Sequence, residues 1–580
     1  MLTLSESNLG SAPLPDPDDL MQPERLATLP PTRLSASRSL LHRMSRERWS
    51  VEIVRFDIDE RARGQAVYRV RTPGHVIDFL VYSFEPKLEG RTGRIIGTDW
   101  DMMGALVEGE TGEEELRRTR EEMPKLYAGR ATPGTLVWCR SNRSLRLFEH
   151  VVARLAEGRQ PDADELWRVG YLMRNTGLDG NGTFGTRSYL ALEDDHPLRL
   201  PYQAQMLSAY LMREFSVDLA EHLARRAGGS TSVRLDPALR RSLGLGNGSA
   251  LGLVFFANTH PALLDRWLTL RSLAVQRARA LPLAPGTPEA GRATELLARA
   301  ARFYEDDPSP YQDFTPASDI AKGLHVLETQ LDAALCSPVP GSVYGDLLRA
   351  LPPRVCTEAR EVYDAVLLEL RPEETDAFLQ HQPVDEELRR DPAQPVGELL
   401  SRLRSEYAWA FAYDMNDPAE RHYRWYKSRD AEEPRRGPAE EVPEGLEWAL
   451  DLPGDIQRLA GALESVPADT LVGEFLADRP GERDTVQRVQ GLAGRRYHSP
   501  HMNMLGEEFV PVHVIRLMNA AFHGLDKTAD ALGRSVLGLL FHGAPTRTDL
   551  AADRASDWIY PQRPTNAPRT AARDKESEQA

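Results

Sequence analysis

Apolar and polar residues alternate in Val51-Glu52-Ile53-Val54-Arg55-Phe56-Asp57, and the alternation returns in Gln65-Ala66-Val67-Tyr68-Arg69-Val70-Arg71. The turn-like Thr72-Pro73-Gly74-His75 then leads into Val76-Ile77-Asp78-Phe79-Leu80-Val81-Tyr82. Short β-branched and aromatic runs joined by tight turns are typical of antiparallel strands. The stretch therefore predicts a β-meander, with Arg94-Ile95-Ile96-Gly97 as a candidate fourth strand.

From about Glu113 the spacing of apolar residues becomes helical. Asp162 and Glu165 form a capping-box-like start to a helix that we expect to continue through Met173. Apolar residues recur at helical spacing from Gln203 to Arg226, and most of the chain to residue 540 alternates helices with short loops. We therefore predict an α+β fold that is predominantly α-helical, with a small N-terminal antiparallel β-meander joined to a large multi-helix body.

Composition divides the 580 residues into six parts, with joints at Pro/Gly-rich or acidic stretches. We expect a proline-rich disordered lead or arm at 1–40, an antiparallel β subdomain at 41–135, a helical region with Gly/Asn-rich loops at 136–281, a helical region with Pro/Gly-rich joints at 282–445, a C-terminal helical region with a His-rich segment at 446–561 and a disordered tail at 562–580.

The charge balance restricts the partners. The chain has 71 basic and 87 acidic residues, a formal net charge of −16, which disfavours nucleic acid and anionic membrane surfaces. Three cysteines in the whole chain fit neither a zinc motif nor a disulfide framework. With no secretory leader and no run of 18 apolar residues, we expect a soluble cytoplasmic protein. Homo-oligomerisation is left open.

Two glycine- and asparagine-dense stretches are the first candidate site. They are Arg174-Asn175-Thr176-Gly177-Leu178-Asp179-Gly180-Asn181-Gly182-Thr183-Phe184-Gly185 and Gly244-Leu245-Gly246-Asn247-Gly248-Ser249-Ala250-Leu251-Gly252. The first contains G-x-G-x-x-G, but a dinucleotide fingerprint needs a strand before it, whereas a helix is expected here. Backbone N–H groups in such turns can instead form an anion nest. We expect anion binding by Arg174, Asn175, Asp179, Asn181, Arg187, Asn247 and Arg516; the alternative is an ordinary helix cap and loop.

A histidine-rich segment is the second candidate site. Five of the 14 histidines lie between 498 and 542: His498, His501, His513, His523 and His542. One hypothesis assigns general acid–base catalysis to His498, His501 or His513. Another assigns a metal to His498 and His501 with Glu507 or His513 as a third ligand. The plain alternative is that these are surface or hydrogen-bonded core histidines.

Other polar groups favour structural interpretations. Glu214, Asp218 and His222 share one helix face, which is more typical of a salt-bridged surface than of a metal site. Arg140 to Ser144 fits a helix N-cap better than an anion site. Cys139 lies in an expected buried strand, so we interpret it as a core residue. Asp417 to Lys427 interleaves bases with aromatics and is interpreted as an amphipathic helix rather than a nucleic-acid tract.

No P-loop, H-E-x-x-H, G-x-S-x-G or C-x-x-C motif occurs. The leading hypothesis is a cytosolic enzyme, of hydrolase, lyase or transferase type, that acts on a small anionic metabolite. Its arginines and Gly/Asn loops would bind the anion, and a C-terminal histidine would transfer a proton. The alternatives are a non-catalytic ligand-binding or scaffold protein, and a metal-dependent enzyme using His498 and His501. The sequence specifies no cofactor.

Overall fold

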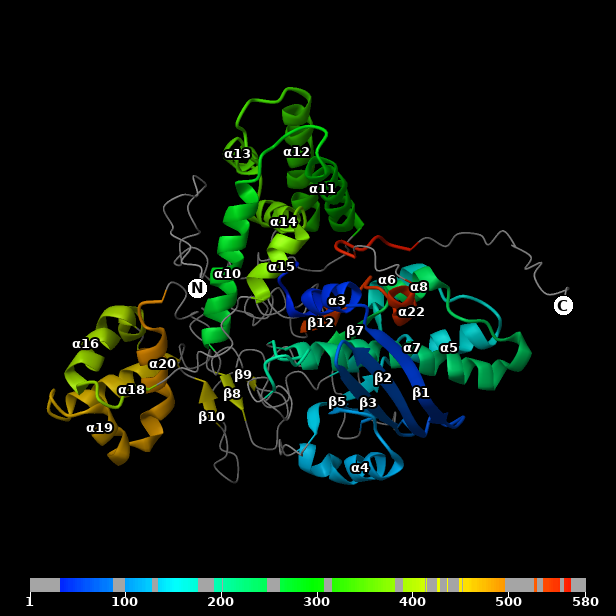
Figure 1. The fold of residues 1–580 in the computed structure, drawn as a ribbon, viewed down its shortest axis with the longest axis horizontal. Coiled ribbons are helices and arrows are strands. Elements are labelled where there is room, and N and C mark those ends of the chain that lie inside the picture. Colours follow the sequence, from blue (N-terminus) through cyan, green and yellow to red (C-terminus); the bar gives the residue numbers. More distant parts are fainter. Residues whose placement is uncertain are drawn as a thin grey trace.

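The computed structural model describes residues 32–86, 100–127, 134–175, 192–200, 202–247, 261–306, 316–380, 390–412, 414, 425–427, 435–436, 448–450, 452–495, 526–528, 536–552 and 558–564. Figure 1 shows a large sheet with a long helix against it, a group of helices above, and a second group of helices to one side. Residues 1–31 of the candidate arm, the 94–97 strand and most of the two candidate sites lie outside the described residues. The expectation of disorder was wrong for the end of the arm, because residues 32–40 are largely buried and helix α3 begins at Ala36.

The meander forms as predicted and continues much further. A nine-stranded sheet runs in the order β1-β2-β3-β4-β5-β6-β7-β12-β11. The expectation of a small meander was therefore wrong: short strands far along the chain add to it, and β6 and β7 pair in parallel. Its strands are β1 Ser50–Ile58, β2 Gly64–Thr72, β3 His75–Ser83, β4 Met102–Glu108, β5 Thr135–Arg143, β6 Tyr171–Asn175, β7 Gly244–Asn247, β11 Asp526–Thr528 and β12 Val536–Leu540.

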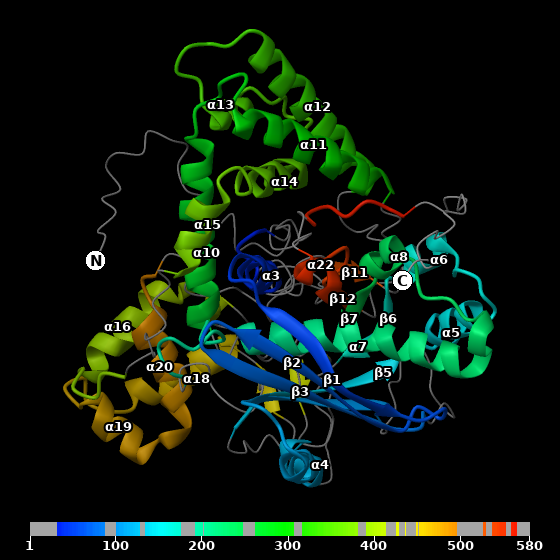
Figure 2. The same ribbon diagram turned by 45° about the vertical axis from the view of Figure 1, so that its right-hand side comes forward.

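The long helix α7, Gln203–Gly228, covers one face of this sheet, and α4, Glu113–Tyr127, lies on the other (Figure 2). Leu207, Tyr210, Leu211, Phe215 and Leu219 of α7 are fully buried, as the helical spacing predicts. Additional helices border this core: α3 Ala36–Arg46, α5 Phe148–Ala156, α6 Ala163–Val169, α8 Pro237–Ser242 and α22 Arg547–Ala551.

Two further cores are helical. The first is formed by α10 Pro261–Arg279, α11 Pro288–Asp306, α12 Ala317–Cys336, α13 Tyr344–Arg349, α14 Thr357–Leu367 and α15 Pro372–Gln380. The second is formed by α16 Val396–Glu406, α18 Leu452–Glu464, α19 Val472–Asp478 and α20 Arg483–Leu492. Short 3₁₀ turns occupy 229–231, 408–412 and 480–482 of the described chain.

A small second sheet has the order β10-β8-β9, formed by Trp448–Leu450, Trp425–Lys427 and Arg435–Arg436. The helix expected through Lys427 is therefore wrong at its end, where Trp425–Lys427 pairs with two other strands. Cross-strand pairing outweighs the helical spacing there, as tertiary context often does for short segments.

A fully buried arginine ties distant parts of the main core together. Arg213 of α7 donates hydrogen bonds to the carbonyls of Leu243 (2.7 Å), Ala544 (2.9 Å), Pro545 (3.1 Å) and Arg241 (3.2 Å). Its guanidinium also contacts the carboxylate of the equally buried Glu214 at 3.1 Å. One side chain thus satisfies backbone acceptors of the turn before β7 and of the segment after β12.

We predict that Arg213→Lys destabilises the fold by about 3–5 kcal/mol, because an ammonium has fewer donors and leaves buried acceptors unpaired. Chemical denaturation followed by circular dichroism measures the free energy of unfolding. The matched control is Arg225→Lys on the exposed part of the same helix, with an expected change within about 0.5 kcal/mol. Equal effects of the two substitutions would contradict the role assigned to Arg213.

Candidate functional site

The strand β6 begins where the sequence pattern suggested continuing helix. Asp162 caps α6 by accepting a hydrogen bond from the Glu165 N–H, as predicted. Gly170 then ends the helix in the left-handed region, with φ of 78°. A Cβ on Gly170 would lie 2.7 Å from Leu539 Cδ2, so both backbone angle and space require glycine. Residues 171–175 are consequently extended, and the helix expected through Met173 was wrong.

The strand register brings the described first residues of the two glycine-rich stretches together. In the parallel pair β6–β7, Asn175 lies opposite Asn247, the last residue of each strand. The two Gly/Asn-dense stretches therefore leave the sheet from adjacent strand ends. Ligands of sheets with parallel strands commonly bind beyond such carboxyl ends, where the following loops gather. The strand before the G-x-G-x-x-G stretch also removes the objection that a helix precedes it.

The first residue of β11, which follows the histidine-rich segment, lies in the same row of the sheet. Because β11 runs in the same direction as β7, the chain enters β11 at this row, whereas it leaves β6 and β7 there. Gly538 of β12 pairs with Asn247, and Asp526 of β11 pairs with Gly538. Residues 498–525 directly precede Asp526 in the chain. One row across the sheet thus contains Ser141, Asn175, Asn247, Gly538 and Asp526. We call this row and the adjoining residues 101 and 140–143 the polar strand end.

On its β4–β5 side, the polar strand end is held by hydrogen bonds between Asp101 and strand β5. The backbone N–H of Asp101 donates to Asn142 Oδ1 at 2.8 Å, and the N–H of Arg143 donates to Asp101 Oδ2 at 2.9 Å. The Arg140–Ser144 helix cap is therefore wrong: residues 140–143 belong to β5, and α5 is preceded by Leu147 without a side-chain cap. Asp101 was not singled out from the sequence, since an isolated aspartate has no diagnostic spacing.

Two arginines share the sheet face opposite α7. Asn142 pairs with Arg174, and Arg140 pairs with Met103, which packs on the α4 side. Paired residues and residues two apart on a strand point to the same face. Arg140 is 5% exposed, and its guanidinium carbon lies 4.2 Å from the centroid of the Trp100 ring. This face of the polar strand end therefore carries two cations, Arg140 and Arg174.

The predicted site residues are placed only in part. Arg174 is half-buried and Asn175 fully buried in β6, while Asn247 is placed by its backbone at the end of β7. Outside the described residues lie Asp179, Asn181, Arg187, His498, His501, His513 and Arg516. Among the five clustered histidines, His542 is described; it is buried with its ring centroid 4.4 Å from that of Trp167, which is a core environment.

The face of α7 that carries Glu214, Asp218 and His222 is salt-bridged, as predicted. Arg240 contacts Asp218 at 2.9 Å and Glu214 at 3.3 Å, and His222 Nε2 lies 2.8 Å from the Ile58 carbonyl oxygen. Within the described ranges, no group of three or more histidine, cysteine, aspartate or glutamate side chains is arranged to hold a metal ion. His498 and His501 lie outside those ranges.

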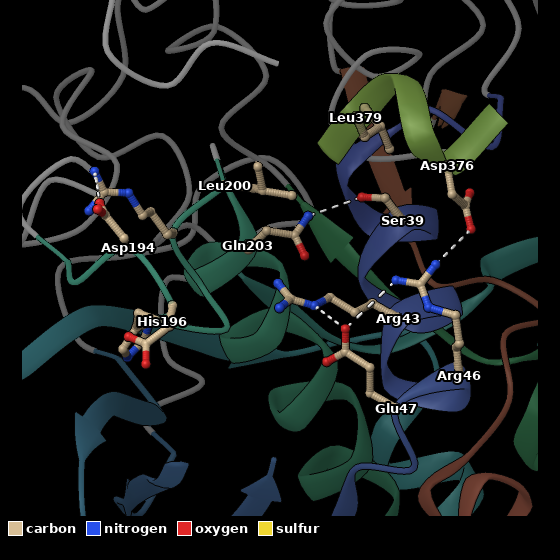
Figure 3. Close-up of a pocket in the computed structure, with 12 residues that line it drawn as sticks. Ser39, Arg43, Arg46, Glu47, Asp194, His196, Leu200, Gln203, Asp376 and Leu379 are labelled. Carbon is tan, nitrogen blue, oxygen red and sulfur yellow. Dashed lines mark hydrogen bonds and ion pairs between the residues drawn. The ribbon is translucent and has the colours of Figure 1, made fainter. Parts of the chain in front are cut away.

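A separate cleft of about 510 Å³ lies between α3, residues 194–200 and α15 (Figure 3). Its charges pair with one another: Arg43 with Glu47 at 2.8 Å, Arg199 with Asp194 at 2.9 Å, and Arg46 with Asp376 at 3.5 Å. Gln203 donates to Ser39 across it at 3.0 Å. Because cations and carboxylates alternate around it, this mixed-charge cleft is better suited to holding α3 against α15 than to binding an anion.

His196, which lines the mixed-charge cleft, has both ring nitrogens engaged. Nδ1 accepts a hydrogen bond from the Leu198 N–H at 3.0 Å, which places the proton of the neutral ring on Nε2. Nε2 faces Glu108 Oε1 at 3.3 Å, and the ring packs edge-on against His75. A histidine base needs an accessible lone pair, so this arrangement positions residues 196–198 rather than a substrate.

Comparisons with protein-family models, with curated proteins and with solved structures give no match to this chain. In the part of the chain that the structure describes, no helix combines the length and the apolar character needed to cross a bilayer. The polar strand end itself is therefore the basis for inferring a function.

We predict that Cys139, beside the polar strand end, is unreactive in the folded protein. Burial raises the pKa of its thiol to about 12, whereas Cys336 is exposed. Thiolate is the reactive form, so a disulfide reagent at pH 8 should label Cys336 rapidly and Cys139 after unfolding. Peptide mapping identifies the labelled thiols, and Cys336→Ser should remove the fast phase. Rapid native labelling of Cys139 would contradict its burial.

We also predict that His42 destabilises the fold at mildly acidic pH. Arg33 Nη1 lies 3.2 Å from His42 Nε2, and burial, followed by the charge of Arg33, lowers the pKa of His42 to about 3. Below about pH 6.5 the unfolded chain takes up a proton that the folded chain excludes. Stability should therefore fall as pH decreases from 6.5 to 4.5, by up to about 1.4 kcal/mol per pH unit from this group.

Urea denaturation of the wild type and His42→Gln over that pH range measures this contribution. The variant should lose less stability than the wild type as the pH falls. His325→Gln is the control of opposite sign, because hydrogen bonds to Glu305 and Glu328 raise the pKa of His325. Removing that histidine should steepen the loss. An unchanged pH dependence in His42→Gln would refute the prediction.

Proposed function

We propose that this protein is an enzyme that binds a small anionic metabolite at the polar strand end. The observation that carries the proposal is the register of four neighbouring strands. Asn175 is opposite Asn247, Asn247 is opposite Gly538, and Gly538 is opposite Asp526. Three segments chosen for their unusual composition thereby adjoin one row of one sheet: two follow Asn175 and Asn247, and the third precedes Asp526, hundreds of residues further along the chain.

The anion would be held by cations and by backbone N–H groups. Arg174 and Arg140 share the face opposite α7 at this end, and guanidinium groups bind carboxylates and phosphates in bidentate geometry. Asp179, Asn181 and Arg187 follow β6 in the chain, and glycine-rich turns can direct successive N–H groups to one anion. A net-acidic chain makes such a local positive site selective for small anions over extended polyanions.

Proton transfer is assigned to the histidine-rich segment that leads into β11. His498 and His501 are the first choices, with His513 and Arg516 further along the same segment. A positioned imidazole with a pKa near neutrality can act as general acid or base. The reaction would be a hydrolysis, elimination or group transfer on the anionic substrate.

The first experiment is a thermal-shift screen of mono-, di- and tricarboxylates and of phosphorylated metabolites, accompanied by metal analysis of the purified protein. A ligand at 100 times its Kd should stabilise the fold by about 2.7 kcal/mol. Ligands found in this way are then incubated with the protein and followed by mass spectrometry for conversion. Binding without conversion would leave a ligand-binding protein and refute the enzymatic part of the proposal.

With such a ligand, we predict that Arg174→Gln weakens binding by about 10- to 100-fold, the effect of losing a charge-assisted contact of roughly 1.5–3 kcal/mol. Arg168→Gln, exposed on the preceding helix α6, is the matched control and should bind normally. Alanine at His498, His501 or His513 should reduce turnover by about 10²–10⁴-fold at one of the three positions. Full turnover in all three histidine variants would end the acid–base assignment.

A further inference from the structure

A second pocket, distinct from the polar strand end, lies where the sheet core meets the first helical core. Its volume is about 520 Å³, and its walls come from α8, α11, Gly543 and residues 558–564. In Figure 2 the red segment containing 558–564 passes between α11 above and α8 below. Pockets at such junctions between cores are frequent ligand sites, because both sides contribute side chains.

The charged residues of this junction pocket are mostly arginines. Arg241 of α8 and Arg292 and Arg299 of α11 line it, and Glu295 is the one carboxylate among the described residues of its wall. The remaining polar side chains are Ser242 and Gln562, and Trp558, Pro561 and Pro564 provide an apolar part. Among the described residues of the wall, three arginines thus face one carboxylate, although the chain as a whole has a net charge of −16.

Backbone contacts hold two of these arginines in place. Arg241 Nε donates to the Gly543 carbonyl at 3.0 Å, and Arg299 Nε donates to the Tyr560 carbonyl at 3.4 Å. Gln562 Nε2 donates to the carbonyls of Arg299 and Tyr560 at 3.2 Å and 3.0 Å, which fixes the segment against α11. Anchoring through Nε leaves the orientation of each guanidinium plane defined, and a preorganised cation loses less entropy on binding an anion.

The arginines repel one another. Burial lowers the pKa of Arg299, and the charges of Arg292, Arg241 and Arg38 lower it further, while Glu295 acts in the opposite direction. Arg38 is 1% exposed, lies 5.5 Å from the centroid of the Trp558 ring, and is 3.9 Å from Glu369. Among the described residues none accepts a hydrogen bond from its guanidinium. A bound anion would relieve this repulsion, since its charge is opposite to that of all four groups.

We propose that the junction pocket is a binding site for a small, multiply charged anion that bridges α8 and α11. Arg292 and Arg299 would bind it from one core and Arg241 from the other. Phosphate esters and polycarboxylates share the chemistry that this pocket recognises, namely several anionic oxygens spaced for bidentate contact with guanidinium groups. Because ligand contacts come from both cores, binding would stabilise their junction. The free energy of unfolding would then rise with the concentration of the anion.

Calorimetric titration of the full chain with inorganic pyrophosphate tests the site. Citrate is titrated in parallel at equal ionic strength, so that phosphate and polycarboxylate sources are distinguished. We expect Arg292→Gln to weaken binding by about tenfold, the size of one charge-assisted contact. Arg302→Gln, exposed on the same helix outside the pocket, should leave binding unchanged. Unfolding midpoints without anion establish that both variants are folded.

Glu295→Gln provides a result of opposite sign. Glu295 contacts Arg292 at 3.0 Å and competes with an anion for it, so its neutralisation should tighten binding about threefold, as expected for removing one partly exposed repulsive charge. Arg174→Gln changes the polar strand end instead. This variant should retain the anion binding that Arg292→Gln weakens. Absence of pyrophosphate and citrate binding, or equal binding by wild type, Arg292→Gln and Glu295→Gln, would overturn the junction site without touching the proposed enzymatic site.

Discussion

The hydrogen bonds of Arg213 are the constraint on which the main core depends. A guanidinium has five N–H donors in one plane, and four backbone carbonyls with one carboxylate surround it in a fully buried position. Two of the acceptors, Ala544 and Pro545, lie more than 300 residues from α7 in the chain. Lysine or an apolar residue could not satisfy this set, so the return of the chain after β12 is coupled to a single side chain on α7.

That coupling explains how a meander becomes a nine-stranded sheet. Strands β1 to β5 follow one another along the chain, as hydrophobic alternation and turns require. Strands β6, β7, β12 and β11 are short, and they join because α6 ends at Gly170 and because the 540–545 segment is fixed beside β7. The parallel β6–β7 pair follows from these two constraints. This pair places the last residues of β6 and β7 side by side at the polar strand end.

Arginine also connects the sheet core with the first helical core. Arg33 binds Asp376 at 2.6 Å and Glu369 at 3.1 Å. Within the helical core, Arg279 of α10 binds Asp364 of α14 at 2.5 Å. Burial raises the pKa of Asp364, while Arg279 opposes that effect. Buried pairs of this kind fix geometry more than they add stability, because desolvation offsets much of their attraction. In the junction pocket, Arg241, Arg292 and Arg299 line the described wall together with one carboxylate, Glu295, and this group of side chains is the proposed anion site.

The sequence by itself determined the elements whose signals are local. The strands at 51–57, 65–71 and 76–82, the cap at Asp162 and the helix from Gln203 are set by period, turn residues and capping groups within a few positions. The polarity of the salt-bridged face of α7 and the burial of Cys139 were equally readable, because they follow from helix spacing and strand composition. The roles proposed for the histidines and glycine-rich stretches remain predictions, since most of those residues lie outside the described ranges.

Tertiary structure alone decided the extent of the sheet, the parallel pairing of β6 with β7, and the partners of the buried arginines. Strands of three to five residues carry too little periodicity to distinguish them from helix ends or loops, and their pairing energy comes from neighbours distant in the chain. Asp101 and the junction arginines show no motif for the same reason: their neighbours come from segments tens to hundreds of residues away. Both candidate sites consist of residues that are far apart in the chain and neighbours in the fold, so no local sequence pattern marks them.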